Sequence, residues 1–190
     1  SDVYKRQIVE DSREIWIDHP HWVSMEARAA NSEGKGSVTL NELVRQCLRM
    51  RPDRIVLGEV RGAELRDLLM ALNTGHEGGC GTVHANGVAE VPARLEALAA
   101  LGGLSREAAS AQITAALHTV IHVERGERGR RVAEIGVFVD VEGRAVVLPA
   151  VRWDADGVMT LGDGAGRLSQ LLGMEAVSYT HLTLPTSGLG

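Results

Sequence analysis

The stretch Arg54–Glu64 reads RIVLGEVRGAE, and it decides the fold class of the chain. It begins with a short continuous apolar run, the pattern of a strand that is covered on both faces of a parallel sheet. A glycine and then a single glutamate, Glu59, follow at the point where this strand ends. Ligands of open α/β sheets bind at the carboxyl ends of the strands. The stretch therefore predicts an α/β protein with Glu59 at the ligand-binding edge.

The segments on either side of this strand alternate between helix and strand. Upstream, Thr39 and Glu42 have the spacing of a capping box, and "IVE" at Ile8–Glu10 reads as the end of an earlier buried strand. Downstream, residues 63–75 read as a helix and the glycine-rich residues 78–86 as a third strand. This alternation predicts a parallel sheet with helices. The helix after the capping box carries apolar side chains at helical spacing: Leu40, Leu43, Val44, Cys47 and Leu48.

The second half of the chain has a different organisation. Residues 88–103 and 104–119 read as two alanine-rich helices, the second capped by Ser105. Residues 120–151 read as three strands joined by tight turns at "GERG" and "EGR". A weak strand near "VMTL" and a short helix near "RLSQLLG" follow. The expected fold is an α/β parallel sheet with helices, followed by a helical pair and an antiparallel strand meander.

The composition narrows the class of protein further. The chain has 190 residues, 44% of them hydrophobic and 24% charged, which is typical of a globular domain. No apolar run approaches the roughly 20 residues that span a bilayer. A net charge of -5 and 3% aromatic residues argue against a nucleic-acid surface or a base-stacking platform. Cys47 and Cys80 lie in apolar segments, which predicts reduced core residues of a cytosolic protein.

The two ends of the chain fit none of these patterns. The DNA string GATGTGTATAAGAGACAG can encode Asp2–Gln7, and its reverse complement can encode Val177–His181. Two unrelated protein ends should not be reverse complements of each other, and the string resembles a transposon-end sequencing adaptor. We therefore expect residues 1–7 and 177–190 to be adaptor-encoded, and the remainder to be a piece of a longer gene product.

Polar side chains follow each of the three predicted parallel strands: Glu10 with Asp11, then Glu59, and then a segment containing His84. A carboxylate at a strand end can orient water for attack on a γ-phosphate, or hold Mg²⁺ through water, as in a Walker B motif. The usual motif ends in Asp-Glu, whereas Gly58 replaces the aspartate here. The alternative for Glu59 is a surface glutamate that simply follows a core strand.

Two histidines, His76 and His84, flank a glycine-rich run. Glycines let the backbone approach a ligand closely, and an imidazole can hydrogen-bond a terminal phosphate. The alternative is that each histidine is a loop or core residue held by hydrogen bonds. The spacing does not favour a zinc site, although metal binding by these two histidines stays open.

Residues 48–86, LRMRPDRIVLGEVRGAELRDLLMALNTGHEGGCGTVHAN, resemble the ATPases that drive type II and type IV secretion and pilus assembly. The resemblance is strongest to the tad-pilus and conjugal-transfer-associated members. "IVEDSREI" matches the Asp box of that family, "RIVLGEVRG" its atypical Walker B motif, and "TGHEGGCGTVHAN" its His box. The three motifs occur in family order, and the match runs from about Ile8 to Val139.

The resemblance implies a RecA-like fold that uses ATP and Mg²⁺. It implies three catalytic residues, namely Glu59, Glu10 and His84. It also implies five nucleotide-binding residues, of which Arg61 would link Walker B to the nucleotide or to a neighbouring subunit: His76, Arg61, Asp11, Glu14 and Arg28. It implies no direct metal ligand, with Mg²⁺ held through water by Glu59 or Glu10. The alternative for Arg61 is a surface ion pair with Glu64.

No segment matches the phosphate-binding loop pattern G-x-x-x-x-G-K-[ST]. "EGKGS" at Glu33–Ser37 lacks the first glycine, and no apolar strand leads into it. The family has this loop upstream of the Asp box. We therefore expect residues 8–140 to be the C-terminal part of a RecA-like ATPase domain and residues 141–176 a strand and helix extension. We expect weak or no ATP binding and negligible turnover from this chain alone.

For the full-length protein, the resemblance implies a homo-hexamer at the cytoplasmic face of the inner membrane. It would act with inner-membrane platform proteins in export or pilus assembly, without contacting nucleic acid directly. Two alternatives stay open. One is a P-loop-free regulatory or scaffold module that docks on an active ATPase, and the other is a RecA-like DNA-binding motor.

Overall fold

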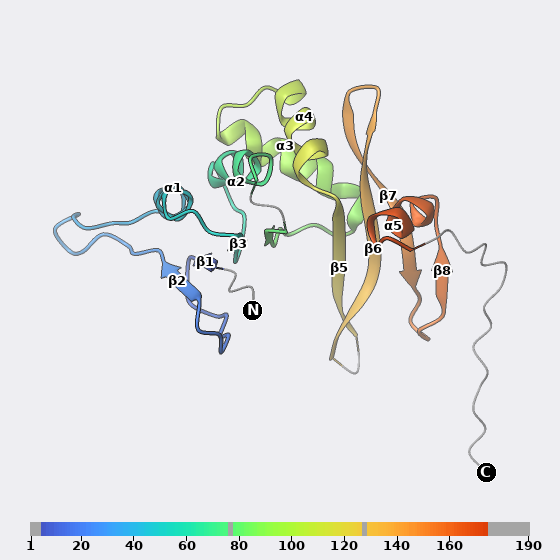
Figure 1. Cartoon of the computed structure of the whole chain (residues 1–190), viewed down its shortest axis with the longest axis horizontal. Coiled ribbons are helices and arrows are strands. Elements are labelled where there is room, and N and C mark those ends of the chain that lie inside the picture. Colours follow the sequence, from blue (N-terminus) through green and yellow to red (C-terminus); the bar gives the residue numbers. More distant parts are fainter. Residues whose placement is uncertain (1–4, 76–77, 127–128, 175–190) are drawn as a thin grey trace, which may run out of the picture.

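The computed structural model describes residues 5–75, 78–126 and 129–174, and it contains a parallel and an antiparallel sheet. The parallel sheet has the order β2-β1-β3-β4. Its strands are β1 (Arg6–Glu10), β2 (Trp22–Glu26), β3 (Arg54–Leu57) and β4 (Cys80–Gly81). Figure 1 shows this sheet at one end of the molecule, the antiparallel sheet at the other, and helices between them.

The register of the parallel sheet sets the position of the candidate site. Val9 of β1 pairs with Leu57 of β3, and Leu57 pairs with Gly81 of β4. The residues that follow these positions, Glu10 and Gly58, therefore meet at the carboxyl edge of the sheet. Ile8, Val9, Ile55 and Leu57 are fully buried, as expected of strands covered on both faces. The predicted parallel α/β sheet is confirmed.

The third predicted strand is much shorter than its sequence suggests. The sequence predicts a strand over residues 78–86, but β4 covers only Cys80–Gly81. The partner strand β3 ends at Leu57, so only Val56 and Leu57 pair with β4. Beyond that point, the carbonyl of Thr82 accepts a hydrogen bond from the Val60 N–H (2.8 Å), which belongs to a loop.

Helices α1 (Leu40–Arg49) and α2 (Glu64–Leu72) cover one face of the parallel sheet (Figure 1). The predicted capping box is present: Thr39 Oγ1 accepts the Glu42 N–H at 3.2 Å, and the Glu42 carboxylate accepts the Thr39 N–H at 2.8 Å. The predicted apolar face of α1 packs into the core, with Leu40, Val44 and Cys47 buried and Leu43 and Leu48 packed against them.

The second half of the chain also matches its predicted organisation. A short 3₁₀ helix η1 (Val88–Glu90) leads into α3 (Val91–Leu101), and α4 (Arg106–Ala116) follows with Ser105 as its N-cap. The antiparallel sheet then runs in the order β5-β6-β7-β8. Its strands, and the helix after them, are β5 (Thr119–Gly126), β6 (Gly129–Val141), β7 (Arg144–Trp153), β8 (Met159–Leu161) and α5 (Ala165–Leu171).

The predicted "EGR" turn joins β6 to β7 through Glu142 and Gly143, both at positive φ. The predicted "GERG" turn includes residues outside the described ranges. None of the helices in the described ranges is long and apolar enough to cross a membrane.

One continuous apolar core joins the two sheets through the helices. It includes Val9 and Leu57 of the parallel sheet, Ile113 of α4, and Phe138 and Val147 of the antiparallel sheet. Buried Ser110 of α4 adds a polar link, because its hydroxyl accepts the N–H of Ala145 in β7. The parallel sheet is therefore held against a support that belongs to the second half of the chain.

The prediction of buried, reduced cysteines is confirmed for Cys47 and wrong for the burial of Cys80. Both are free, but only Cys47 is buried, whereas Cys80 is exposed because it lies on the edge strand β4. Burial raises the pKa of the Cys47 thiol to about 12, and its Sγ donates to Gln7 Oε1 at 2.6 Å.

Arg6 and Gln7 lie inside the segment predicted to be adaptor-encoded, yet they form the start of β1. The origin of that segment stays a prediction.

Candidate functional site

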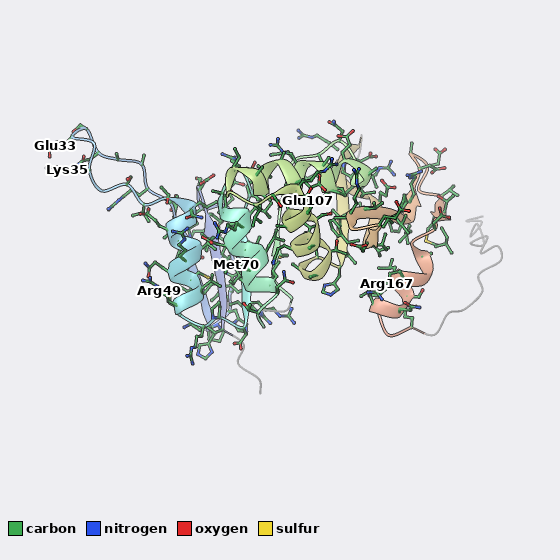
Figure 2. All side chains as sticks on the ribbon, turned by 90° about the horizontal axis from the view of Figure 1, so that it is seen from above. Glu33, Lys35, Arg49, Met70, Glu107 and Arg167 are labelled. Atoms are coloured by element: carbon green, nitrogen blue, oxygen red, sulfur yellow. The ribbon has the colours of Figure 1, made fainter. Side chains whose placement is uncertain are left out.

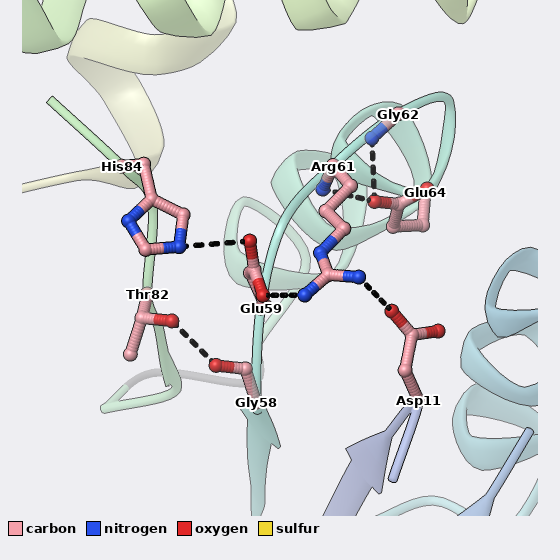
Figure 3. A network of polar contacts seen from close by, with 8 residues as sticks. All are labelled: Asp11, Gly58, Glu59, Arg61, Gly62, Glu64, Thr82 and His84. Carbon is pink, nitrogen blue, oxygen red and sulfur yellow. Dashed lines mark hydrogen bonds and ion pairs between the residues drawn. The ribbon is translucent and has the colours of Figure 1, made fainter.

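The loop that follows β3 carries Glu59 and Arg61 at the carboxyl edge of the parallel sheet. Figure 3 shows the Glu59 carboxylate between the imidazole of His84 and the guanidinium of Arg61. His84 Nε2 lies 3.2 Å from Glu59 Oε1, and Arg61 Nη2 donates to Glu59 Oε2. The other terminal nitrogen of Arg61 lies 3.4 Å from Asp11 Oδ2. Side chains that follow three different strands thus meet at one point.

The charges of this cluster favour an ionised glutamate. The hydrogen bond from Arg61 lowers the pKa of Glu59; desolvation opposes this effect, and the charges of Arg61 and His84 reinforce it. The same contact with Glu59 raises the pKa of Arg61. The Glu59 side chain is 21% exposed and the His84 side chain 86% exposed. Glu59 is therefore a deprotonated acceptor that an incoming ligand can reach, with a solvent-facing imidazole beside it.

Glu10 lies beside the cluster and is buried, at 4% exposure. Its Oε1 accepts the backbone N–H groups of Glu14 (3.2 Å) and Ile15 (3.1 Å), which fixes the turn after β1. A Cβ atom at position 58 would lie 2.8 Å from Glu10 Cγ. Gly58 replaces the usual aspartate because Glu10, from the neighbouring strand, occupies the space that a side chain at 58 would need.

Two further residues hold the backbone of the Glu59 loop. The Thr82 hydroxyl donates to the carbonyl of Gly58. On the other side, Glu64 Oε1 accepts the N–H groups of Arg61 (2.6 Å) and Gly62 (2.7 Å). The alternative of an Arg61–Glu64 ion pair is therefore wrong. The Arg61 guanidinium contacts Glu59 and Asp11, whereas the Glu64 carboxylate binds backbone.

Four of the eight predicted site residues meet in this cluster: Asp11, Glu59, Arg61 and His84. Glu10 lies beside the cluster, against Gly58. Glu14 adjoins it, since its N–H binds Glu10 and its charge acts on Arg61. His76 lies outside the described residues. The Arg28 side chain instead donates from Nε to the Gly36 carbonyl at 2.8 Å.

Arg28 and Gly36 belong to the loop between β2 and α1. Figure 2 shows Glu33 and Lys35 at the tip of this loop, where it projects away from the body of the molecule. The structure thus does not bring Arg28 to the cluster.

Within the described ranges, no three His, Cys, Asp or Glu side chains are arranged to hold a metal ion directly. A shallow pocket opens beside His84 and continues along η1 and α3, lined by Ala85, Asn86, Ala89, Glu90, Ala93 and Arg94.

Sequence comparison gives a consistent family. The model of the "Type II/IV secretion system protein" family matches residues 3–158. A Mycobacterium tuberculosis protein that is provisionally named for conjugal transfer is 58% identical over 165 residues, which are 86% of this chain and 46% of that protein. The conjugal transfer protein TrbB of Rhizobium radiobacter is 35% identical over 72% of this chain and 38% of its own length. The chain thus spans less than half the length of these two relatives.

Solved structures agree with the sequence relatives. The VirB11 ATPase of the Brucella suis type IV secretion system, crystallised with sulphate, has a TM-score of 0.60 and 28% identity over 70% of this chain and 39% of its own. The Legionella pneumophila ATPase DotB shares the fold at a TM-score of 0.51 and 23% identity over 90% of this chain and 40% of its own. With its parallel sheet and the Glu59 cluster at the sheet edge, the chain has a RecA-like α/β core and belongs to the type II/IV secretion system protein family.

Proposed function

We propose that this chain is the part of a secretion ATPase domain that supplies its catalytic acids. The observation that carries the proposal is the cluster in which Glu59 contacts His84 and Arg61, while Arg61 also contacts Asp11, so that side chains from the ends of three strands meet. Buried Glu10 lies beside this cluster, against Gly58. Parallel α/β sheets bind ligands at this edge. Two acids, an imidazole and a guanidinium are the groups that position water and stabilise charge during phosphoryl transfer.

Each residue has a distinct role in this proposal. Glu59, ionised and reachable, accepts a hydrogen bond from the attacking water and orients it. Glu10 is held by two backbone N–H groups and presents a fixed negative charge beside Gly58. His84 is mostly exposed and donates to an oxygen of the terminal phosphate. Arg61 links the acids to the nucleotide or to a neighbouring subunit.

The donor set fits ATP with Mg²⁺, because carboxylates bind magnesium through water and the imidazole and guanidinium suit phosphate oxygens. Bound Mg²⁺ would neutralise the charge that develops on the phosphate oxygens. His76, like His84, would lie near the terminal phosphate, while Asp11 and Glu14 would support the water shell. Arg28 is left without a role at this site within one subunit.

At the level of the whole protein, we propose a homo-hexamer with ATP bound between subunits, at the cytoplasmic face of the inner membrane. An upstream segment of the full-length protein would supply the phosphate-binding loop. ATP hydrolysis by the hexamer would be coupled to membrane platform proteins and would drive export, tad-type pilus assembly or conjugal transfer. The names of the relatives, the conjugal transfer protein TrbB and the type IV secretion system protein VirB11 among them, support the role in secretion and conjugal transfer.

The test is the Glu59→Gln variant of the full-length protein. The amide keeps the shape of the side chain but is a poor acceptor for a water proton. ATP turnover should therefore fall by about 100-fold or more, while ATP binding measured by calorimetry is retained. Glu33→Gln, at the tip of the projecting loop (Figure 2), should leave both quantities unchanged. Wild-type turnover by Glu59→Gln would reject the catalytic role.

A further inference from the structure

We propose that Glu64 is a positioning residue that sets the conformation of the Glu59–Gly62 loop, so that Arg61 is held against Glu59. This inference rests on the proposed function only in calling Glu59 catalytic. The positioning itself is a property of the structure and can be measured without nucleotide.

The first step of the argument is the way in which α2 begins. The N-cap residue Ala63 has no side chain that could cap the helix. Glu64, the first residue of α2, instead turns its carboxylate back toward the preceding loop. Its Oε1 accepts the N–H of Arg61 at 2.6 Å and that of Gly62 at 2.7 Å. Charge-assisted bonds of this kind are roughly twice as strong as neutral ones.

The second step is burial. Glu64 is only 6% exposed, although the Arg61 side chain beside it is 63% exposed. A buried carboxylate is costly unless it is hydrogen-bonded, and the two loop N–H groups supply its partners. The loop N–H groups satisfy the buried carboxylate, and the carboxylate satisfies the N–H groups. The loop conformation in which both N–H groups face Glu64 is therefore favoured.

The third step connects the backbone to the guanidinium. At its start the loop is held by Thr82, whose hydroxyl binds the Gly58 carbonyl and whose own carbonyl accepts the Val60 N–H. At its end it is held by Glu64. Glu59 lies between the two backbone groups that Thr82 holds, and Arg61 is held through its own N–H by Glu64. The Arg61 side chain folds back onto Glu59 and Asp11 (Figure 3). Without Glu64, the Arg61 N–H would lose its hydrogen bond to the carboxylate, and with it the contact that orients the Arg61 side chain toward Glu59.

The experiment uses the chain with glutamate carboxyl carbons labelled with ¹³C, and follows the titration of Glu59 by NMR. In the wild type, Glu59 should titrate below the ordinary glutamate range, because Arg61 is bound to it. In Glu64→Ala, the Glu59 titration should move up toward the ordinary range of about 4.3. Glu64→Gln should behave like the wild type, since its single amide oxygen can still accept both N–H groups.

Glu107→Ala serves as the matched control, because Glu107 is also a first-turn glutamate, on α4, and it should leave Glu59 unchanged. A merely structural role for Glu64 would weaken α2 without moving the Glu59 titration. A folded Glu64→Ala with an unshifted Glu59, or a folded Glu64→Gln with a raised one, would overturn the proposal.

A measurement on the wild-type chain covers the case in which Glu64→Ala does not fold. The Arg61 and Gly62 amides should exchange slowly with solvent, since the Glu64 carboxylate accepts both. Exchange at the rate of an unprotected loop would refute the positioning role. These readouts are separate from the test of function: if Glu59→Gln keeps its turnover while Glu64→Ala shifts Glu59, the proposed function fails and the positioning stands.

Discussion

Gly58 is the residue at which the segment after β3 departs from the usual Walker B pattern, and the structure gives a reason for the glycine. The motif usually has an aspartate at this position, but here the Glu10 side chain from β1 lies directly against Gly58. An acid from the neighbouring strand thus takes the place of an acid on the motif strand. The reason for a glycine here is the lack of space for a side chain. It is not the backbone conformation, because Gly58 does not have a positive φ.

Gly58→Ala should therefore destabilise the protein. The new Cβ would lie 2.8 Å from Glu10 Cγ, so Glu10 must move and loosen its bonds to the N–H groups of Glu14 and Ile15. Overpacking of this kind costs about 1–3 kcal/mol of unfolding free energy, which urea denaturation can measure. Gly87→Ala is the control, because nothing lies within 4 Å of a Cβ at that position.

The contact between the two residues can be tested by a double-mutant cycle. If the collision with Glu10 is the cause, the cost of Gly58→Ala should shrink in a Glu10→Ala background, because contacting residues are energetically coupled. Equal costs in both backgrounds would show that Glu10 does not explain the glycine.

At the scale of elements, α1 shows how a helix end can depend on pH. The Thr39 N–H and hydroxyl, in that order, lower the pKa of Glu42. A folded-state pKa below the unfolded value means that the ionised carboxylate stabilises the folded chain above the unfolded pKa. This contribution is lost as the pH falls through the folded pKa.

The difference in thermal midpoint between wild type and Glu42→Gln should therefore be larger at pH 7 than at pH 3. The reason is that protonated glutamate and glutamine carry no charge, so the two proteins become alike in acid. Circular dichroism melts across this range measure the difference. Thr39→Ser keeps the capping hydroxyl. In a Thr39→Ser background, the difference in thermal midpoint between glutamate and glutamine at position 42 should therefore depend on pH as it does in the wild type. A difference that is constant from pH 7 to pH 3 would contradict the assigned role of the capping box.

The sequence predicted the elements whose pattern is local. The capping box at Thr39 and the apolar face of α1 depend on residues within a few positions of each other, and both were found. The length of β4 was not predictable in this way, because the end of its partner β3 sets it. Cys80 was misjudged for the same reason: an apolar neighbourhood in the sequence does not reveal an edge strand.

The same distinction applies to the candidate site. The position of Glu10 beside Gly58, the residue before Glu59, could be expected, because parallel strands end at one edge of a sheet. The partners of Arg61 could not be expected, since they depend on a loop that is held by Thr82 and Glu64 from outside strand β3. The resemblance to the family implied a nucleotide-binding role for Arg28, but its side chain binds the Gly36 carbonyl within its own loop.

For the whole molecule, the main feature is that the two sheets share one core. Leu95 of α3 and Ile113 of α4 belong to the same apolar cluster as Val9 of the parallel sheet and Val147 of the antiparallel sheet. A domain with a single core usually unfolds in one cooperative step. The second half of the chain is therefore a structural support for the candidate site, and a change in its packing should lower the stability of both sheets.

Ser110 provides the sharpest test of this coupling. It is 1% exposed on α4, and its hydroxyl accepts the N–H of Ala145, which is 5% exposed on β7. Ser110→Ala leaves that buried N–H without a partner, which costs about 1–3 kcal/mol. Calorimetry should show one transition in both proteins, shifted to a lower temperature in the variant, whereas Ser32→Ala in the projecting loop should leave it in place. If Ser110→Ala instead split the transition in two, with the parallel sheet melting at its wild-type temperature, the antiparallel half would be an independent unit and would not support the Glu59 site.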